Sequence, residues 1–369
     1  MPNWFEIKNI DLLDSPALVI HTDRVKANIQ TAIRMVGDVG RLRPHVKTNK
    51  SPGAIDLMLQ AGIRKFKCAT IAEAEMLAQC KAVDVLLAYQ PLGPKLQRFI
   101  NLINKYPGTN FSCLCDNEAA ADEQSKAFAA TGNLVPVYMD LNIGMNRTGI
   151  IPGYGAISLY KKLASLPGIN IAGLHAYDGH MRDPDIQLRT VACDKAYDMV
   201  LQLKKELQQK GLPVPTIIAG GSPSFSIHSK RTDCECSPGT FIYWDKGYLD
   251  LCPEQEFLPA AVLITRVISL PNETRVCVDL GHKSVAAENE ITRRVFFLNA
   301  DGLVPVSQSE EHLVLEAPAG HSFKPGDILY ALPFHVCPTV ALYERVYTVE
   351  NNEVLGEWKN ISRDRVLEV

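Results

Sequence analysis

Residues 65–81 read KFKCATIAEAEMLAQCK, a strand-like run followed at once by a helix-like run. The same pairing recurs along the chain from residue 40 onward, with helix-like stretches such as LQRFINLINKY at 96–106 and IQLRTVACDKAYDMVLQLKKELQQKG at 186–211. Strands that take turns with helices indicate βα units and a parallel sheet.

Seven strand-like runs follow this pattern. They are RLRPHV at 41–46, KFKCAT at 65–70, VDVLLAY at 83–89, NFSCLCD at 110–116, LVPVYMDLNI at 134–143, INIAGLHAY at 169–177 and TIIAGG at 216–221. Upstream, ALVIHT at 17–22 is strand-like and DRVKANIQTAIRMVG at 23–37 has apolar residues at helical spacing. Seven or eight such units predict an α/β fold with a closed (β/α)8 TIM-type barrel, although an open sheet has the same periodicity.

The pattern changes near residue 250. Short alternating runs with Pro and Gly turns follow, among them AVLITRVISL, TRVCVDLG, RRVFFLN, HLVLEAP and DILYALP, and we expect no helix there. We therefore predict a barrel over residues 15–250 and an antiparallel β-domain over residues 251–369. The N-terminal segment, residues 1–14, is expected to join the β-domain.

Composition excludes several classes of protein. The 369 residues include 38 basic and 41 acidic side chains, a net charge of −3, with no cationic block. Neither nucleic acid nor a membrane is an expected partner, and the N-terminus MPNWFEIKNIDLLD lacks the pattern of a signal peptide. We expect a cytoplasmic protein whose ten cysteines are reduced.

Candidate functional residues follow the predicted strands, where a parallel barrel has its active site. Lys47, in RPHVKTNKS at 43–51, is one, although a lone lysine in a loop is usually only solvated. Two glycine turns, AGGSPS at 219–224 and SPGTF at 237–241, offer backbone N–H and hydroxyl donors that suit a phosphate. We expect the next strand to begin at SPGTF.

Three further motifs carry polar side chains. DLNIGMNRTGI at 140–150 delivers Arg147, whose guanidinium can bind a phenolate or carboxylate. GLHAYDGH at 173–180 contributes His175, Tyr177 and His180. In FHVCPTVALYE at 334–344 we predict a strand, which would point His335 and Cys337 to one face, where they suit zinc if other ligands complete the site.

Taken together, these motifs resemble the fold-type III pyridoxal-phosphate enzymes, the alanine racemase-like superfamily, and within it the D-threonine aldolase and D-serine dehydratase family. The resemblance spans nearly the full chain. Its motifs are SPALVI at 15–20, RPHVKTNKS, ATIAEAE at 69–75, MDLNIGMNRTGI at 139–150, GLHAYDGH, AGGSPS with SPGTF, VDLGHKS at 278–284, SEEH at 309–312 and PFHVCPTVALYE at 333–344.

The resemblance implies a role for most of these residues. Lys47 would form the Schiff base with pyridoxal 5'-phosphate, and His335 with Cys337 would bind a divalent metal, most simply zinc. The residues expected around the cofactor are His45, Arg147, His175, Tyr177, Gly221, Ser222, Gly239 and Thr240. The chain departs from the family in having Asn49 where many relatives have His, and Ser237 where alanine racemase has an arginine facing the pyridine nitrogen.

The implied function is a lyase acting on β-hydroxy D-amino acids. Retro-aldol cleavage to glycine and an aldehyde would use His180 as the base at the substrate hydroxyl. A D-serine dehydratase-type elimination to a keto acid and ammonia, with Lys47 as the base at the α-carbon, is the alternative. A racemase and a non-catalytic cofactor carrier are rival interpretations. Such carriers consist of a barrel alone, so the predicted β-domain and the His335–Cys337 pair argue against a carrier. The family expectation is a monomer or homodimer.

Overall fold

The chain forms two compact units in the computed structural model, which describes residues 3–369. The barrel unit comprises residues 32–47, 55–239 and 364–369, and the β-unit comprises residues 3–31, 48–54 and 240–363. Residues 1 and 2 of the predicted 1–14 segment lie outside the described part of the chain. Within residues 3–369, no helix is both long and apolar enough to cross a membrane.

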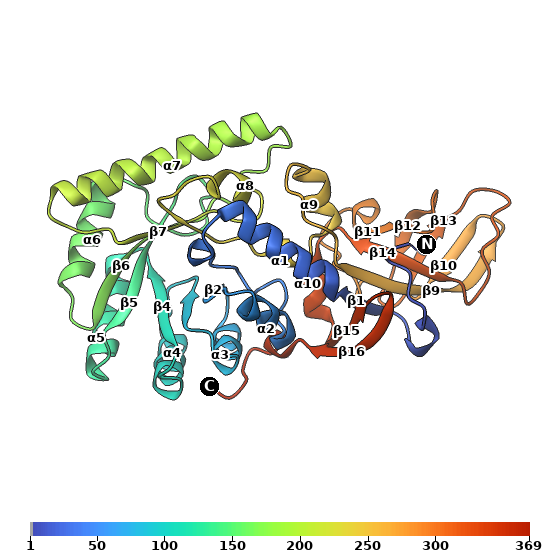
Figure 1. Cartoon of the computed structure of the whole chain (residues 1–369), viewed down its shortest axis with the longest axis horizontal. Coiled ribbons are helices and arrows are strands. Elements are labelled where there is room, and N and C mark those ends of the chain that lie inside the picture. The colour runs from blue at the N-terminus through green and yellow to red at the C-terminus, as the bar shows by residue number, and fades with distance from the viewer. Residues whose placement is uncertain (1–2) are drawn as a thin grey trace. The chain divides into compact units, whose positions relative to one another are not determined.

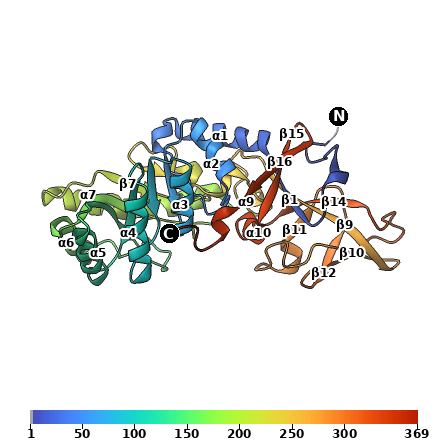
Figure 2. The ribbon, with the colours of Figure 1, turned by 90° about the horizontal axis from the view of Figure 1, so that it is seen from below.

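The barrel unit contains a seven-stranded parallel sheet whose strands follow the chain order. They are β2 (Lys65–Cys68), β3 (Asp84–Leu87), β4 (Asn110–Cys115), β5 (Val135–Leu141), β6 (Ile169–Ala176), β7 (Thr216–Ala219) and β8 (Glu235–Cys236). Helices lie around the outside of these strands (Figures 1 and 2). They are α3 (Ile71–Gln79), α4 (Pro94–Lys105), α5 (Glu118–Ala130), α6 (Tyr154–Ser165), α7 (Ile186–Gln209) and the short α8 (Phe225–His228).

Residues 42–46 close this sheet in the place of an eighth strand. Leu42 bridges Cys236 in β8, and His45 bridges Lys67 in β2. The N–H of Arg43 donates to the Cys236 carbonyl at 2.9 Å, but Pro44 has no N–H to extend the pairing. The predicted strand at 41–46 is thus reduced to two isolated bridges, while the predicted barrel is confirmed.

The barrel interior is packed. Leu86, Leu114, Tyr138 and Ile218 form an apolar cluster contributed by four different strands. The Arg43 side chain, which is 1% exposed, forms ion pairs with Asp84 at 2.5 Å and with Glu235 at 2.7 Å. Buried charges of this kind require paired partners, so Arg43 has a structural role.

Local sequence explains how α3 begins after β2. The hydroxyl of Thr70 accepts the N–H of Glu73 at 3.0 Å, and the Glu73 carboxylate accepts the N–H of Ala69 at 2.6 Å. This reciprocal pair satisfies N–H groups that the first turn leaves open. The ATIAEAE motif therefore fixes where strand β2 gives way to helix α3.

The β-unit contains a nine-stranded sheet whose main path runs β12-β13-β10-β9-β1-β15-β16, with β14 pairing both β9 and β11. The strands are β1 (Ala17–His21), β9 (Ala261–Asn272), β10 (Arg275–Val278), β11 (Val295–Phe297), β12 (Val304–Gln308), β13 (Leu313–Glu316), β14 (Ile328–Pro333), β15 (Arg345–Glu350) and β16 (Glu353–Lys359). Most pairs are antiparallel, and β1 with β15 is parallel. Val19, Val262, Ile264, Tyr330 and Leu332 belong to its core.

Two features of the β-unit differ from the sequence-based expectation. Strand β1, which we placed at the start of the barrel, pairs with β9 and β15 instead. Residues predicted to be a strand around Cys337 form helix α10 (Val336–Leu342), with His335 at its N-cap. Pro338 is tolerated there because the first turn of a helix has no use for its missing N–H.

Three further α-helices and five 3-10 turns of residues 3–369 lie outside the βα units described above. They are α1 (Thr22–Val36), α2 (Pro52–Gln60), α9 (Lys246–Leu251) and the 3-10 turns at Ile10–Leu12, Val39–Arg41, Thr240–Ile242, Ile291–Arg293 and Ile361–Arg363. The division between the two units falls within α1 and α2, and also at the Lys47–Thr48, Gly239–Thr240 and Arg363–Asp364 peptide bonds.

Candidate active site

Lys47 ends the segment that closes the barrel. The imidazole Nδ1 of His45 accepts the backbone N–H of Lys47 at 3.3 Å. His45 therefore fixes the backbone that carries the lysine, in addition to any contact with a cofactor. The second lysine of the motif, Lys50, lies in the β-unit with a φ of 51°, and its amino group is 3.5 Å from the Ser362 carbonyl.

The ring of Tyr177, directly after β6, brings together residues from separate motifs of the barrel unit. The guanidinium carbon of Arg147 lies 5.0 Å from the ring centroid, and the amino group of Lys67 lies 5.4 Å from it. A Cβ on Gly221 would come within 2.8 Å of the Tyr177 ring, so the glycine loop after β7 packs directly on the tyrosine. All these residues lie at or just beyond the carboxyl ends of strands, as expected for a barrel active site.

Lys67, on β2, was not among the predicted site residues. It is 2% exposed, and burial together with repulsion from Lys47 lowers its pKa to about 7. The signal lay in the alternation of KFKCAT, because Lys65 and Lys67 point to one side of the strand and the buried Phe66 and Cys68 point to the other.

Asp140 and His175 face one another from adjacent strands β5 and β6, with 2.7 Å between Asp140 Oδ1 and His175 Nδ1. Burial lowers the pKa of His175. The hydrogen bond to Asp140 acts to raise this pKa, and the positive charges of Lys67 and Arg147 act to lower it further. Burial raises the pKa of Asp140, but the hydrogen bonds from His175 and Thr148 outweigh it and lower that pKa. Since a carboxylate only accepts, Nδ1 carries the proton, and His175 Nε2 is buried without a partner among residues 3–369.

His180 lies against the turn that follows β5. A Cβ on Gly144, which has a φ of 120°, would meet His180 Nε2 at 2.9 Å. Its Nδ1 is buried and has no hydrogen-bond partner in the described part of the chain. An imidazole with an unused nitrogen is suited to move a proton of a bound substrate.

The two glycine turns predicted for a phosphate are joined to each other. Gly239 donates its N–H to the Ser222 hydroxyl at 3.2 Å, and Gly221 donates to the Ser224 hydroxyl at 3.2 Å. The strand expected to begin at SPGTF lies before it, as β8, so Gly239 belongs to the turn itself. The two N–H groups are thus held by serine hydroxyls at adjacent strand ends, and a phosphate there would replace those hydroxyls as their acceptor.

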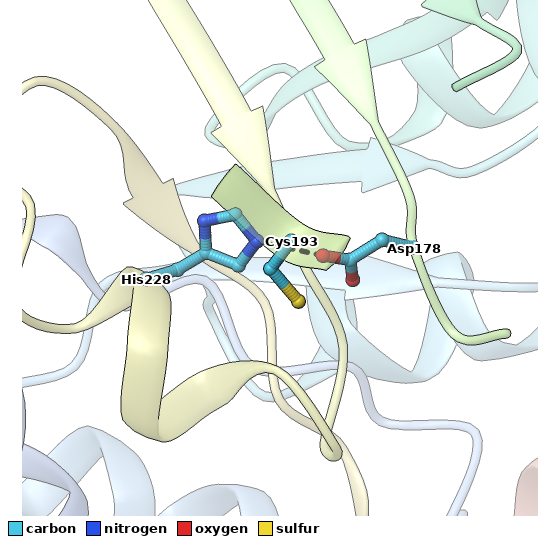
Figure 3. A group of neighbouring side chains, drawn as sticks. All are labelled: Asp178, Cys193 and His228. Carbon is cyan, nitrogen blue, oxygen red and sulfur yellow. Dashed lines mark hydrogen bonds and ion pairs between the residues drawn. The ribbon is translucent and has the colours of Figure 1, made fainter. Parts of the chain in front are cut away.

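A buried network supports the first of these turns. The Asp178 carboxylate accepts the Ser224 hydroxyl at 2.5 Å and pairs with His228 Nε2 at 2.7 Å. Figure 3 shows the Asp178 carboxylate and the His228 ring facing one another beside Cys193. Asp178 stands inside GLHAYDGH, but we gave it no role, because its partners come from residues 222–228.

Asp178, Cys193 and His228 are also close enough to be considered as metal ligands, the one such group of three in residues 3–369. Burial raises the pKa of the Cys193 thiol, and Asp178 raises it further, so the sulfur keeps its proton. A carboxylate and an imidazole at 2.7 Å are hydrogen-bonded rather than spread around an ion. We interpret this group as a structural network.

In the β-unit, the predicted metal pair lies at the start of α10. The Nδ1 of His335 is 2.5 Å from Glu288 Oε1, and Cys337 Sγ is 3.1 Å from the Thr48 hydroxyl. Burial lowers the pKa of His335, but its hydrogen bonds to Cys337 and Glu288 outweigh it and raise the pKa to about 9. His335 and Cys337 are thus adjacent, although a helix start rather than a strand brings them together.

This arrangement fits a metal ion. A histidine ligand usually donates its second N–H to a carboxylate, which orients the ring. Glu288 occupies that position at Nδ1, so an ion shared with Cys337 would take the place of the proton on Nε2. Thr240, which we assigned to the phosphate, has its hydroxyl 3.8 Å from Cys337 Sγ within the same unit. Glu288 was missed because nothing in the run AAENE marks it.

Comparison with known proteins identifies relatives of the whole chain. Residues 20–246 match the family model "Alanine racemase, N-terminal domain", and residues 260–349 match "Putative serine dehydratase domain". A D-threonine aldolase from Arthrobacter sp is 25% identical over 95% of this chain and 93% of its own length. A D-threo-3-hydroxyaspartate dehydratase from Delftia sp. (strain HT23) is 24% identical over 95% of this chain and 97% of its own. The crystal structure of a D-threonine aldolase from Filomicrobium marinum superimposes with a TM-score of 0.89, 26% identity and 99% coverage of both chains.

Proposed function

Because the chain belongs to the family defined by the alanine racemase N-terminal domain, we propose that it is a lyase that acts on β-hydroxy D-amino acids with pyridoxal 5'-phosphate and a divalent metal. The full-length similarity to a D-threonine aldolase and to a hydroxyaspartate dehydratase supports this class of substrate. The observation that carries the proposal is the convergence of Arg147, Lys67 and the Gly221 loop on Tyr177.

The barrel residues would hold the cofactor. Lys47 would bind it covalently through its amino group. Gly221, Ser222 and Gly239, with Thr240, would bind its phosphate, which would replace the serine hydroxyls as the acceptor of the two glycine N–H groups. Pyridoxal phosphate supplies an electron sink for the pair released when a bond to the α-carbon breaks. Arg147, Tyr177 and His175 would line the ring, and the unpartnered Nε2 of His175 is available to it.

His335 and Cys337 would hold the metal, which supplies Lewis-acid polarisation of the substrate hydroxyl. The thiolate favours zinc among the common ions. His180 would take the proton from that hydroxyl, so that the bond between the α- and β-carbons breaks and glycine and an aldehyde are released.

β-Elimination is the second candidate, because residues 260–349 match a serine dehydratase domain and a full-length relative is a dehydratase. In that reaction Lys47 would take the α-proton, and the products would be a keto acid and ammonia. A racemase is less well supported, because Ser237, where that enzyme has an arginine, donates its hydroxyl to the Arg43 carbonyl at 2.8 Å.

The test is to incubate the protein, loaded with pyridoxal phosphate and zinc, with D-threonine, L-threonine and D-serine, and to assay glycine against keto acid. We expect glycine and acetaldehyde from D-threonine, no cleavage of L-threonine, and loss of activity with a chelator while the cofactor stays bound. His180→Ala should lower turnover by about 100-fold or more yet keep the cofactor.

Lys47→Ala should lose the cofactor that borohydride fixes to the protein, and Lys50→Ala, in the same motif, is the matched control that should keep it. Keto acid without glycine would replace the aldolase by the dehydratase. Inversion at the α-carbon alone would exclude both.

A further inference from the structure

Lys67 is a buried lysine that the proposed reaction does not use. Its backbone is fixed beside the segment that carries Lys47, because its N–H donates to the Pro44 carbonyl at 2.8 Å and its carbonyl accepts the Val46 N–H at 2.9 Å. The side chain is buried in the barrel unit and reaches the face of Tyr177.

No carboxylate is paired with this ammonium group in residues 3–369. Asp140 and Asp178 attract it at longer range, but Asp140 is bonded to His175, and Asp178 is bonded to His228 and Ser224. Lys47 and Arg43 repel it. A buried ammonium without a partner costs several kcal/mol, so this position is poor for a cation unless an anion joins it.

Lys67 is therefore a buried cation among other cations. Arg43 is neutralised by Asp84 and Glu235, but Lys47 repels Lys67, which is left with the longer-range attraction of two engaged carboxylates. Arg147, over the same Tyr177 ring, is exposed and adds a further positive charge. An anionic ligand at this end of the barrel would relieve the repulsion, since a nearby opposite charge favours the charged form of each group.

We propose that Lys67 is a second cationic ligand, beside Arg147, for the anionic ring oxygen of the cofactor, an inference that rests on the proposed function. This oxygen is bonded to the ring carbon next to the one that carries the aldehyde. When the aldehyde condenses with Lys47, the oxygen comes within hydrogen-bonding distance of the lysine nitrogen, and Lys47 is the charged group that acts most strongly on Lys67. A substrate carboxylate is the other anion with the same chemistry.

The test is an absorbance titration of the holoenzyme, which reports the pH at which the imine nitrogen on Lys47 loses its proton. A cation beside the ring oxygen stabilises the deprotonated imine, so we expect Lys67→Met to raise the midpoint by about one pH unit or more, a tenfold change. Lys67→Arg should stay close to wild type. Lys65→Met is the matched control, because Lys65 is two residues away on β2, pairs with Glu235, and should leave the midpoint unchanged.

Each outcome bears on the inference. An unchanged midpoint in Lys67→Met overturns it, and if only the KM for the D-amino acid rises, the ammonium binds the substrate carboxylate instead. Should Lys67→Met and Lys67→Gln both lose the cofactor while Lys67→Arg keeps it, and all three remain folded without it at the assay temperature, the inference is supported through affinity. A wild-type protein that acquires no cofactor on Lys47 overturns the proposed function itself.

Discussion

Two acid–histidine pairs lie in the barrel unit with the same 2.7 Å separation, Asp140 with His175 and Asp178 with His228. His228 uses both ring nitrogens, since Arg231 Nε lies 3.3 Å from its Nδ1, whereas His175 Nε2 has no partner in the described residues. Asp178 also accepts the Ser224 hydroxyl. We call Asp178–His228 the closed pair, and Asp140–His175, with its unused ring nitrogen, the open pair. The acid–histidine distance is therefore the same in a structural pair and in a pair that could bind a ligand. The unused Nε2 of His175 is what distinguishes Asp140–His175 as the pair available to a ligand.

The largest expected difference between the pairs is in stability. Asp178→Asn leaves one of the buried donors, from Ser224 or His228, without an acceptor, and breaking such a network costs about 3 kcal/mol. Asp140→Asn keeps an oxygen for His175 Nδ1, and Thr148, whose hydroxyl also donates to Asp140, is exposed and can turn to water, so this change should cost about 1 kcal/mol. Urea unfolding of the cofactor-free variants measures both. Equal losses, or a larger loss for Asp140→Asn, would break the distinction between a closed and an open pair.

The second expected effect is a pH dependence of stability that comes from Lys67. This residue belongs to the surroundings of the Asp140–His175 pair, because its charge lowers the pKa of His175. Burial lowers the pKa of Lys67 from 10.5 to about 7, so between these values the unfolded chain holds a proton that the native protein lacks. The free energy of unfolding of cofactor-free protein should thus rise with pH, by about 2 kcal/mol from pH 7.5 to 9.5 relative to Lys67→Met. Denaturant titrations at both pH values check this. Parallel pH profiles for the two proteins would remove Lys67 from the surroundings of the open pair.

The smallest expected effect isolates the buried hydroxyl that Asp178 of the closed pair accepts. Ser224→Ala removes a donor to Asp178 and the acceptor of the Gly221 N–H, and should lower the free energy of unfolding by about 1 kcal/mol. Ser222→Ala, in the same turn, removes the acceptor of the Gly239 N–H and serves as the matched control. A thermal unfolding series resolves the order. A neutral Ser224→Ala would show that Asp178 does not depend on the hydroxyl.

The parts of the fold that sequence could predict are those determined by local periodicity. The alternation of strands and helices from β2 to β7 indicated the barrel, because each βα unit carries its own pattern. β1 could not be assigned in this way, since ALVIH is a plain apolar run whose partners β9 and β15 lie far along the chain. Helix α10 was missed because its β-branched residues and Pro338 are also typical of strands and turns.

The candidate site divides in the same manner. Residues within recognisable motifs, such as Lys47 and Arg147, could be named from the sequence, and Arg147 lies on Tyr177 in the structure. Asp140, Glu288 and Lys67 could not, because an acid or a lysine has no distinctive local signal and gains its role from the residues folded against it. Their partners come from other strands and loops.

The two isolated bridges that close the barrel also have a kinetic consequence. His45 can pair with β2 early, because Lys67 follows it closely in the chain, but Leu42 needs β8, whose formation requires nearly the whole barrel unit. Contacts between residues so distant along the chain form slowly, since the intervening chain must first be ordered. With so few hydrogen bonds, this seam should also be the first part of the barrel to open and exchange its amide protons. Lys47, which follows the early bridge at His45, is therefore positioned beside β2 before Leu42 closes the rest of the seam against β8.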